Sequence, residues 1–196
     1  MSSFQLQSVK SVLGYQSNIG TIAVMGPLIT SFLGPNPTLS FHAACSFGST
    51  ELLNWMWGSS CSSVEARTNN WSLTNYLRSD SHYQKWQFAE ALEDAAGRGD
   101  LKVMRWICSH FPRGLISETV VTVAVTNGHL NSLQYLLNHD ESPERSGIEH
   151  THTVEWSDYS VMESSILNKH YEIILWLCQT FPEKTEAWTR GNYKEK

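Results

Sequence analysis

The apolar positions of this chain recur with the period of a helix, and the pattern returns 70 residues later, from Trp106 to Trp176. Residues three or four apart share one face of a helix, so each segment is predicted to be a helix with one buried face. The predicted buried stripes are Leu101, Met104, Cys108 and Phe111 in the first segment, and Tyr171, Ile174, Cys178 and Phe181 in the second.

Four copies of one pattern align on the aromatic residues Trp55, Trp106, Tyr135 and Trp176. In three of them small or apolar residues precede a Gly, a polar residue follows, and a second apolar helix begins there. Gly adopts the left-handed conformation that ends a helix, and Ser49 or Asp100 is expected to cap the next helix. The fourth copy has Lys169 in place of Gly, which predicts a loss of stability or a differently built turn. Pro112 and Pro182 are expected to stop the second helices.

The third copy contains a conflict between local propensity and repeat pattern. Thr119–Val125 is rich in β-branched residues and precedes Asn127-Gly128, which is typical of a strand entering a hairpin. The following leucines form a helical face, and packing against neighbours overrides weak local propensity. We therefore predict a helix here. Ser81 and Gln84 are expected to form a capping box before the second copy.

Helix pairs repeated in this way predict an all-α fold, organised as a short helical-repeat solenoid. Residues 1–40 do not match the repeat and are expected to form an N-terminal capping segment, followed by the array at 41–196. The repeat units are expected near residues 41–58, 87–112, 117–138 and 157–182. Polar insertions are expected at 58–80 and at 139–156, the second being a mobile surface insertion.

The units resemble ankyrin repeats in a degenerate form. The best match is Ala124–Leu137, whose Gly-His-Leu and Leu-Leu elements are similar to the core of that family, and Ala95–Ile107 follows with Asp100 in place of His. The resemblance covers residues 40–185 and implies a scaffold or adaptor that binds protein, without catalysis. The family's Thr-Pro-Leu-His opening is absent, and Phe-Pro replaces its Gly-Ala-Asp turn. The β-hairpin fingers of the family are therefore expected to be reduced to plain loops.

Charge and composition narrow the class of partner. The formal net charge is −5, the pI is about 5.9, and no run of Lys or Arg occurs, which disfavours nucleic acid and anionic membrane surfaces. No segment approaches the ~18 apolar residues of a membrane helix, and no signal peptide is evident. The four cysteines lack metal-type spacing. Cys108 and Cys178 occupy equivalent repeat positions and are expected to be small buried residues, which fits a reducing compartment. We expect a cytoplasmic or nuclear protein without a cofactor or metal.

Candidate partner-binding residues lie on the predicted first helices and on the second insertion. An acidic patch on one helix and two threonines on the next are expected to contact a protein partner, together with two histidines of the insertion. These residues are Glu90, Glu93, Asp94, Thr122, Thr126, His150 and His152.

Three alternative functions follow from other motifs. His150 and His152 have the residue type of zinc ligands, and Cys61 in a serine-rich stretch has that of a Cys/His hydrolase nucleophile. No base is evident beside Cys61, so we expect no enzyme. The stretch from Pro27 to Leu33 resembles the beginning of an F-box-like segment, which would make the chain an adaptor that binds a separate protein complex.

Overall fold

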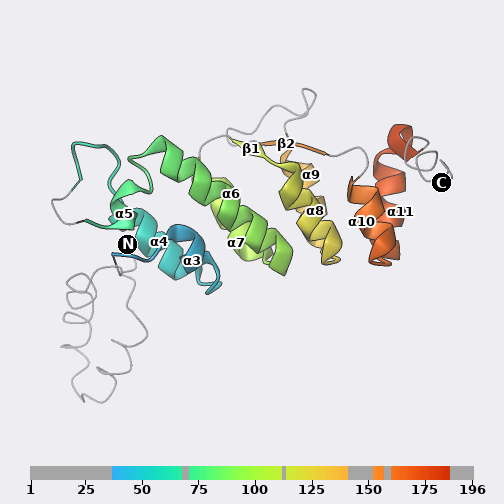
Figure 1. Cartoon of the computed structure of the whole chain (residues 1–196), viewed down its shortest axis with the longest axis horizontal. Coiled ribbons are helices and arrows are strands. Elements are labelled where there is room, and N and C mark those ends of the chain that lie inside the picture. Colours follow the sequence, from blue (N-terminus) through green and yellow to red (C-terminus); the bar gives the residue numbers. More distant parts are fainter. Residues whose placement is uncertain (1–36, 68–70, 112–113, 141–151, 157–159, 186–196) are drawn as a thin grey trace, which may run out of the picture. The chain divides into compact units, whose positions relative to one another are not determined.

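The computed structural model describes residues 37–67, 71–111, 114–140, 152–156 and 160–185, and this part of the chain is mostly helical, as predicted (Figure 1). The chain divides into two compact units, residues 1–84 and 85–196, whereas the sequence placed a boundary at residue 40. The predicted F-box-like stretch and His150 lie outside the described residues.

The described part of the first unit contains one helix pair and a short third helix. Helix α3 (Phe41–Cys45) packs against α4 (Thr50–Ser59), and α4 contacts α5 (Leu73–Tyr76). The first turn of α6 (Ser81–Arg98) also belongs to this unit. The core consists of apolar side chains that are completely or almost completely buried: Phe41, Ala44, Cys45, Leu53, Met56 and Leu77.

In the second unit, the residues that the structure describes form three helix pairs that follow one another (Figure 1). They are formed by the rest of α6 with α7 (Leu101–His110), α8 (Glu118–Thr126) with α9 (Leu130–His139), and α10 (Ser160–Leu167) with α11 (Tyr171–Thr180). Neighbouring pairs contact one another through α8 and α10, and through α7 and α9. The β-branched run before Asn127 is helical, which confirms the prediction for the third copy.

Each of the four helix pairs among the described residues turns at a residue with positive φ. The angles are 64° at Gly48, 67° at Gly99, 77° at Gly128 and 60° at Lys169. The second helix always begins two residues later and runs for ten residues. The aligned aromatic residue is therefore the sixth residue of each second helix, as the sequence alignment requires.

The hydrogen bonds of the turn are the same in all three pairs of the second unit. The residue after the turn donates its backbone N–H to the carbonyl five residues earlier, and this distance is 2.9 Å at Asp100, His129 and His170. This is the Schellman arrangement that ends helices at a left-handed residue. Lys169 thus forms the same turn as the glycines, although a side chain makes its left-handed conformation less favourable.

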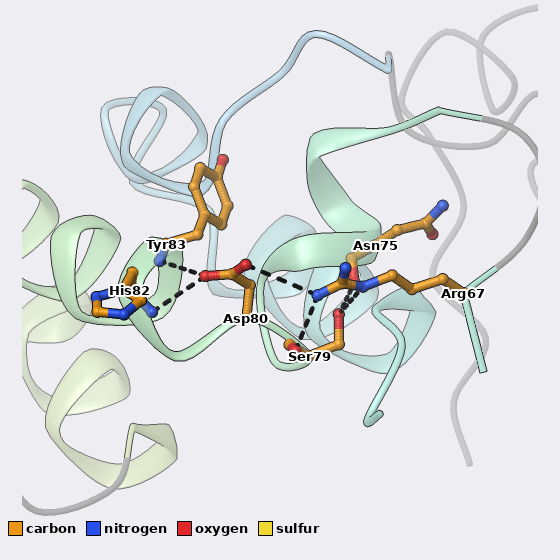
Figure 2. A network of polar contacts seen from close by, with 6 residues as sticks. All are labelled: Arg67, Asn75, Ser79, Asp80, His82 and Tyr83. Atoms are coloured by element: carbon orange, nitrogen blue, oxygen red, sulfur yellow. Dashed lines mark hydrogen bonds and ion pairs between the residues drawn. The ribbon is translucent and has the colours of Figure 1, made fainter. Parts of the chain in front are cut away.

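The helix starts agree only partly with the sequence. Asp100 accepts from Val103 N at 3.1 Å and Ser49 from Leu52 N at 3.3 Å, which confirms both predicted caps. The capping box at Ser81 is wrong, because Asp80 Oδ1 accepts from the backbone N–H of His82 and Tyr83 instead (Figure 2). The Tyr83 bond is the largest cause that holds the pKa of Asp80 below its ordinary value.

Two arginines hold the described part of the 58–80 insertion. Arg67 donates to Ser79 Oγ at 2.8 Å and to Ser79 O at 2.9 Å, and it lies 3.8 Å from Asp80 Oδ2 (Figure 2). Arg78 donates to Ser60 Oγ at 2.6 Å. These guanidinium groups donate to oxygens of Ser60, which caps the end of α4, and of Ser79, which follows α5.

The segments that precede α8 and α10 form a short parallel ladder rather than plain loops. Strand β1 (Leu115–Ile116) pairs with β2 (Thr153–Val154), with Leu115 opposite Thr153. Asp140 accepts from Val154 N and from Trp156 Nε1, both at 3.0 Å. The predicted insertion 139–156 is therefore tied down at both ends, while residues 141–151 lie outside the described part.

The aligned aromatics share a position but not all of their surroundings. The ring centroids of Trp106 and His110 are 3.9 Å apart, and those of Tyr135 and His139 are 4.1 Å apart. Trp176 instead packs near Trp156. The predicted stripe of α11 also differs from that of α7. Tyr171 is 68% exposed because no described helix pair follows α11, while α7 is covered by α9.

Replacing Lys169 with Gly is expected to raise the free energy of unfolding by about 0.5–1 kcal/mol. The substitution removes the ~1–2 kcal/mol cost of a left-handed residue with a side chain, and the greater freedom of Gly in the unfolded chain offsets part of this gain. Chemical denaturation measures the change. Lys102→Gly within α7 is the matched control and should destabilise by about 1 kcal/mol. A loss of stability in Lys169→Gly would contradict the turn geometry.

Candidate functional site

In the second unit a histidine joins each of the last two helix pairs to the pair before it. His129 Nε2 donates to Gly97 O at 3.0 Å, and His170 Nε2 donates to Thr126 O at 3.0 Å. Each histidine directly follows the left-handed residue of its own turn and reaches the last turn of the preceding first helix. This repeated bond, which we call the histidine ladder, fixes the register between successive pairs.

The ladder requires glycine in the preceding turn. A Cβ atom at Gly99 would lie 2.6 Å from His129 Nδ1, and one at Gly128 would lie 2.8 Å from His170 Cε1. Both distances are too short for any side chain, so these glycines serve the close approach of the imidazole as well as the turn. The equal register then places equivalent residues of α6, α8 and α10 side by side.

One surface of the first helices collects most of the predicted partner-binding residues, and we call it the acidic face. Its members lie six or nine positions before the left-handed residue of each pair, with further acidic residues beside them. They are Glu90, Glu93 and Asp94 on α6, Glu118, Thr119 and Thr122 on α8, and Ser160 and Glu163 on α10.

The same diagonal contact connects the acidic face across both junctions. Thr119 Oγ1 donates to Glu93 Oε2 at 3.1 Å, and Thr122 Oγ1 lies 3.4 Å from Ser160 Oγ. In both cases a residue six positions before one left-handed turn residue contacts a residue nine positions before the next one. A second bond, from Ser160 Oγ to Glu118 Oε1, adds to the junction between α8 and α10. The face is therefore one continuous surface over three helices.

Most sequence-predicted residues are accessible on or beside this face. Glu90, Asp94 and Thr126 are exposed, and Glu93 and Thr122 are partly exposed. Asp94 pairs with Arg98 at 3.4 Å within α6, and Thr126 Oγ1 donates to Thr122 O at 2.8 Å. The three acidic residues lie on α6 and the two threonines on α8, so the structure brings together residues from separate copies.

The sequence reasoning missed Glu118, Thr119, Ser160 and Glu163. Counting back six residues from each turn finds Glu163 at once, since it matches Glu93. Counting back nine finds Thr119 and Ser160. Glu118 has no such signal and is recognised only from its bond to Ser160.

The acidic face has an excess of negative charge. The described residues of α6 from position 85 onward, α8 and α10 carry five carboxylates but only two cations, Lys85 and Arg98. Arg98 is already within 3.4 Å of Asp94. Exposed carboxylates that share one surface without matching cations produce a negative potential, which attracts a positively charged partner.

His152 does not lie on a polar surface loop, and this expectation is corrected. The side chain is completely buried and cannot reach a partner. Gly114 N donates to its Nδ1 at 3.0 Å, its Nε2 donates to Cys108 O at 3.2 Å, and its ring stacks on Phe88 at 5.1 Å. The imidazole is a core residue that satisfies two backbone groups at the start of the β1–β2 ladder.

The described side chains form no evident metal or nucleophile site. Within the described ranges no three His, Cys, Asp or Glu residues gather closely enough to hold a metal ion. Burial raises the pKa of the Cys108 thiol to about 11, so it stays protonated at neutral pH and reacts poorly. The Cys61 thiol donates to Ala66 O at 3.2 Å and to Asn75 Oδ1 at 3.5 Å. Neither acceptor is a base that would activate it.

Comparisons with protein-family models, with curated proteins and with solved structures find no match to this chain. In the described part of the chain, no helix combines the length and apolar character that crossing a bilayer requires.

The substitution His152→Ala is expected to lower the free energy of unfolding by about 2–4 kcal/mol. It leaves the Cys108 carbonyl and the Gly114 amide without their partner and opens a cavity beside Phe88. Urea denaturation followed by circular dichroism measures the change. Thr153→Ala, at the exposed neighbour in β2, should change stability by less than about 0.5 kcal/mol. Equal stabilities of the two variants would contradict the buried role of His152.

Proposed function

We propose that this chain is a protein-interaction module that binds a basic protein partner through the acidic face. The observation that carries the proposal is the continuous, net negative surface that α6, α8 and α10 share. The surface is built from polar side chains, and the described residues contain no cluster that could hold a metal ion. It therefore suits recognition better than chemistry.

We further propose that the helix pairs stack as an ankyrin-like solenoid. Three pairs with the same Schellman turn, the same length of second helix and a repeated histidine bond support this arrangement. Arrays of this kind present equivalent positions of successive repeats as an extended binding surface. In this chain those positions hold carboxylates and hydroxyls.

A cytoplasmic or nuclear location is part of the proposal. None of the four cysteines forms a disulfide, and Cys45 and Cys108 are buried. Unpaired buried thiols are usual in reducing compartments.

Neutralising the acidic face is expected to weaken binding of basic peptides by about tenfold. Peptides are first selected on the full chain from a display library of random linear sequences, and their affinities are measured by fluorescence anisotropy. The triple variant Glu90→Gln, Glu93→Gln and Glu118→Gln removes three charges while preserving side-chain shape. A tenfold change corresponds to about 1.4 kcal/mol, a modest sum for three charges at an interface rim.

The matched control removes three exposed carboxylates away from the face, through Glu155→Gln, Glu172→Gln and Glu183→Gln. It has the same net charge as the test variant and should bind basic peptides almost normally. Binding by the native chain should also fall steeply with salt. Equal losses in both variants, or a selection without Lys- or Arg-rich peptides, would refute a specific acidic interface.

A further inference from the structure

A groove runs between the second helices α7 and α9, on a different side of the helix pairs from the acidic face. Its volume is about 670 Å³, within the range of ligand-binding clefts. Cys108 and Tyr135 are buried at its floor. The aromatic residue one pair further on, Trp176, packs against Trp156 and Phe181 instead.

The rim of the groove is polar and contains a cation. Arg105 is exposed, and its guanidinium carbon lies 5.7 Å from the centre of the Tyr135 ring, which holds it over the groove. Among the described residues it forms no ion pair with a carboxylate. Asn131, Gln134 and Asn138 line the opposite wall on α9. None of the nine lining residues is an Asp or Glu.

The spacing of the amide side chains suits an extended chain. Asn131 and Asn138 are seven residues apart in a helix, which corresponds to about 10 Å along its axis at ~1.5 Å per residue. Three residues of an extended peptide cover about the same length at ~3.3 Å each. Each amide offers one acceptor oxygen and two donor hydrogens, which match the C=O and N–H groups of a peptide backbone.

From these features we infer that the groove between α7 and α9 binds an extended acidic peptide segment of a partner protein. The amides of Asn131, Gln134 and Asn138 bond the peptide backbone, and Arg105 takes a carboxylate side chain in a forked hydrogen bond. A basic peptide is disfavoured because Arg105 would repel it and no lining residue offers a carboxylate to pair with its positive charges. The groove and the acidic face thus select peptides of opposite charge.

The test uses the same display library on the full chain and examines the acidic class of selected peptides. Arg105→Gln is expected to lower the affinity for these peptides about tenfold or more, since a hydrogen bond to a charged group is lost. Asn138→Asp is expected to lower this affinity as well, because the new negative charge on the rim repels an acidic peptide. Arg105→Lys should retain part of the affinity, since it keeps the charge but loses the fork.

Two controls separate this site from general electrostatics and from the acidic face. Lys102→Gln removes the same charge from an exposed position of α7 that does not line the groove, and it should leave the affinity unchanged. The triple acidic-face variant should bind acidic peptides at least as well as the native chain. Helical signals of all variants should match that of the native chain.

The outcomes distinguish the alternatives. Selective loss in Arg105→Gln, with peptide-induced NMR shifts confined to α7 and α9, supports the groove. Equal losses in Arg105→Gln and Lys102→Gln, no effect of either, or a selection that yields only basic peptides would overturn it. The last result would still leave the acidic face as the binding surface.

Discussion

The arrangement of the second unit depends on an imidazole that bonds to the preceding helix while resting on a glycine. At both junctions the histidine after the turn donates to a carbonyl of the helix pair before it, at 3.0 Å. The glycine beneath must supply a left-handed turn and also leave room for the ring. Lys169 meets only the first of these demands, since no described histidine of a following helix pair packs on it. This explains why a side chain is tolerated there and nowhere else in the ladder.

The fixed register has a direct consequence for recognition. It aligns residues six and nine positions before each turn, so that Glu93 meets Thr119 and Thr122 meets Ser160 across successive pairs. The same register places α7 beside α9 and leaves the groove whose rim carries Arg105. One geometric constraint thus creates two surfaces of opposite charge, and we propose that each recognises a different kind of peptide.

Helical periodicity and turn chemistry predicted the pairs, because Gly99 and Gly128 mark the turns and Asp100 caps the next helix. The same local signals could not place His152, whose partners are the distant Cys108 carbonyl and Gly114 amide. The parallel ladder of β1 and β2 was missed because each strand has two residues and is held by pairing between distant segments. Such contacts arise from tertiary packing and leave little local pattern.

The candidate site was predictable only where its residues fell on an obvious helix. Glu90, Glu93 and Asp94 were recognised as an acidic patch, and Thr122 and Thr126 as their neighbours. The groove was not, because its amides look like ordinary surface residues until α7 and α9 are side by side. Positional matching from the left-handed residue would have found Glu163 and Ser160, and it is the more general rule for this chain.

A double-mutant cycle between Gly128→Ala and His170→Ala tests the ladder most directly. Alone, Gly128→Ala should destabilise the chain through both the left-handed turn and the clash of the new methyl group with the imidazole. Once His170 is Ala, only the turn cost remains, so the cost of Gly128→Ala should fall by about 1 kcal/mol. Additive effects, within about 0.3–0.5 kcal/mol, would contradict the contact between the ring and the glycine.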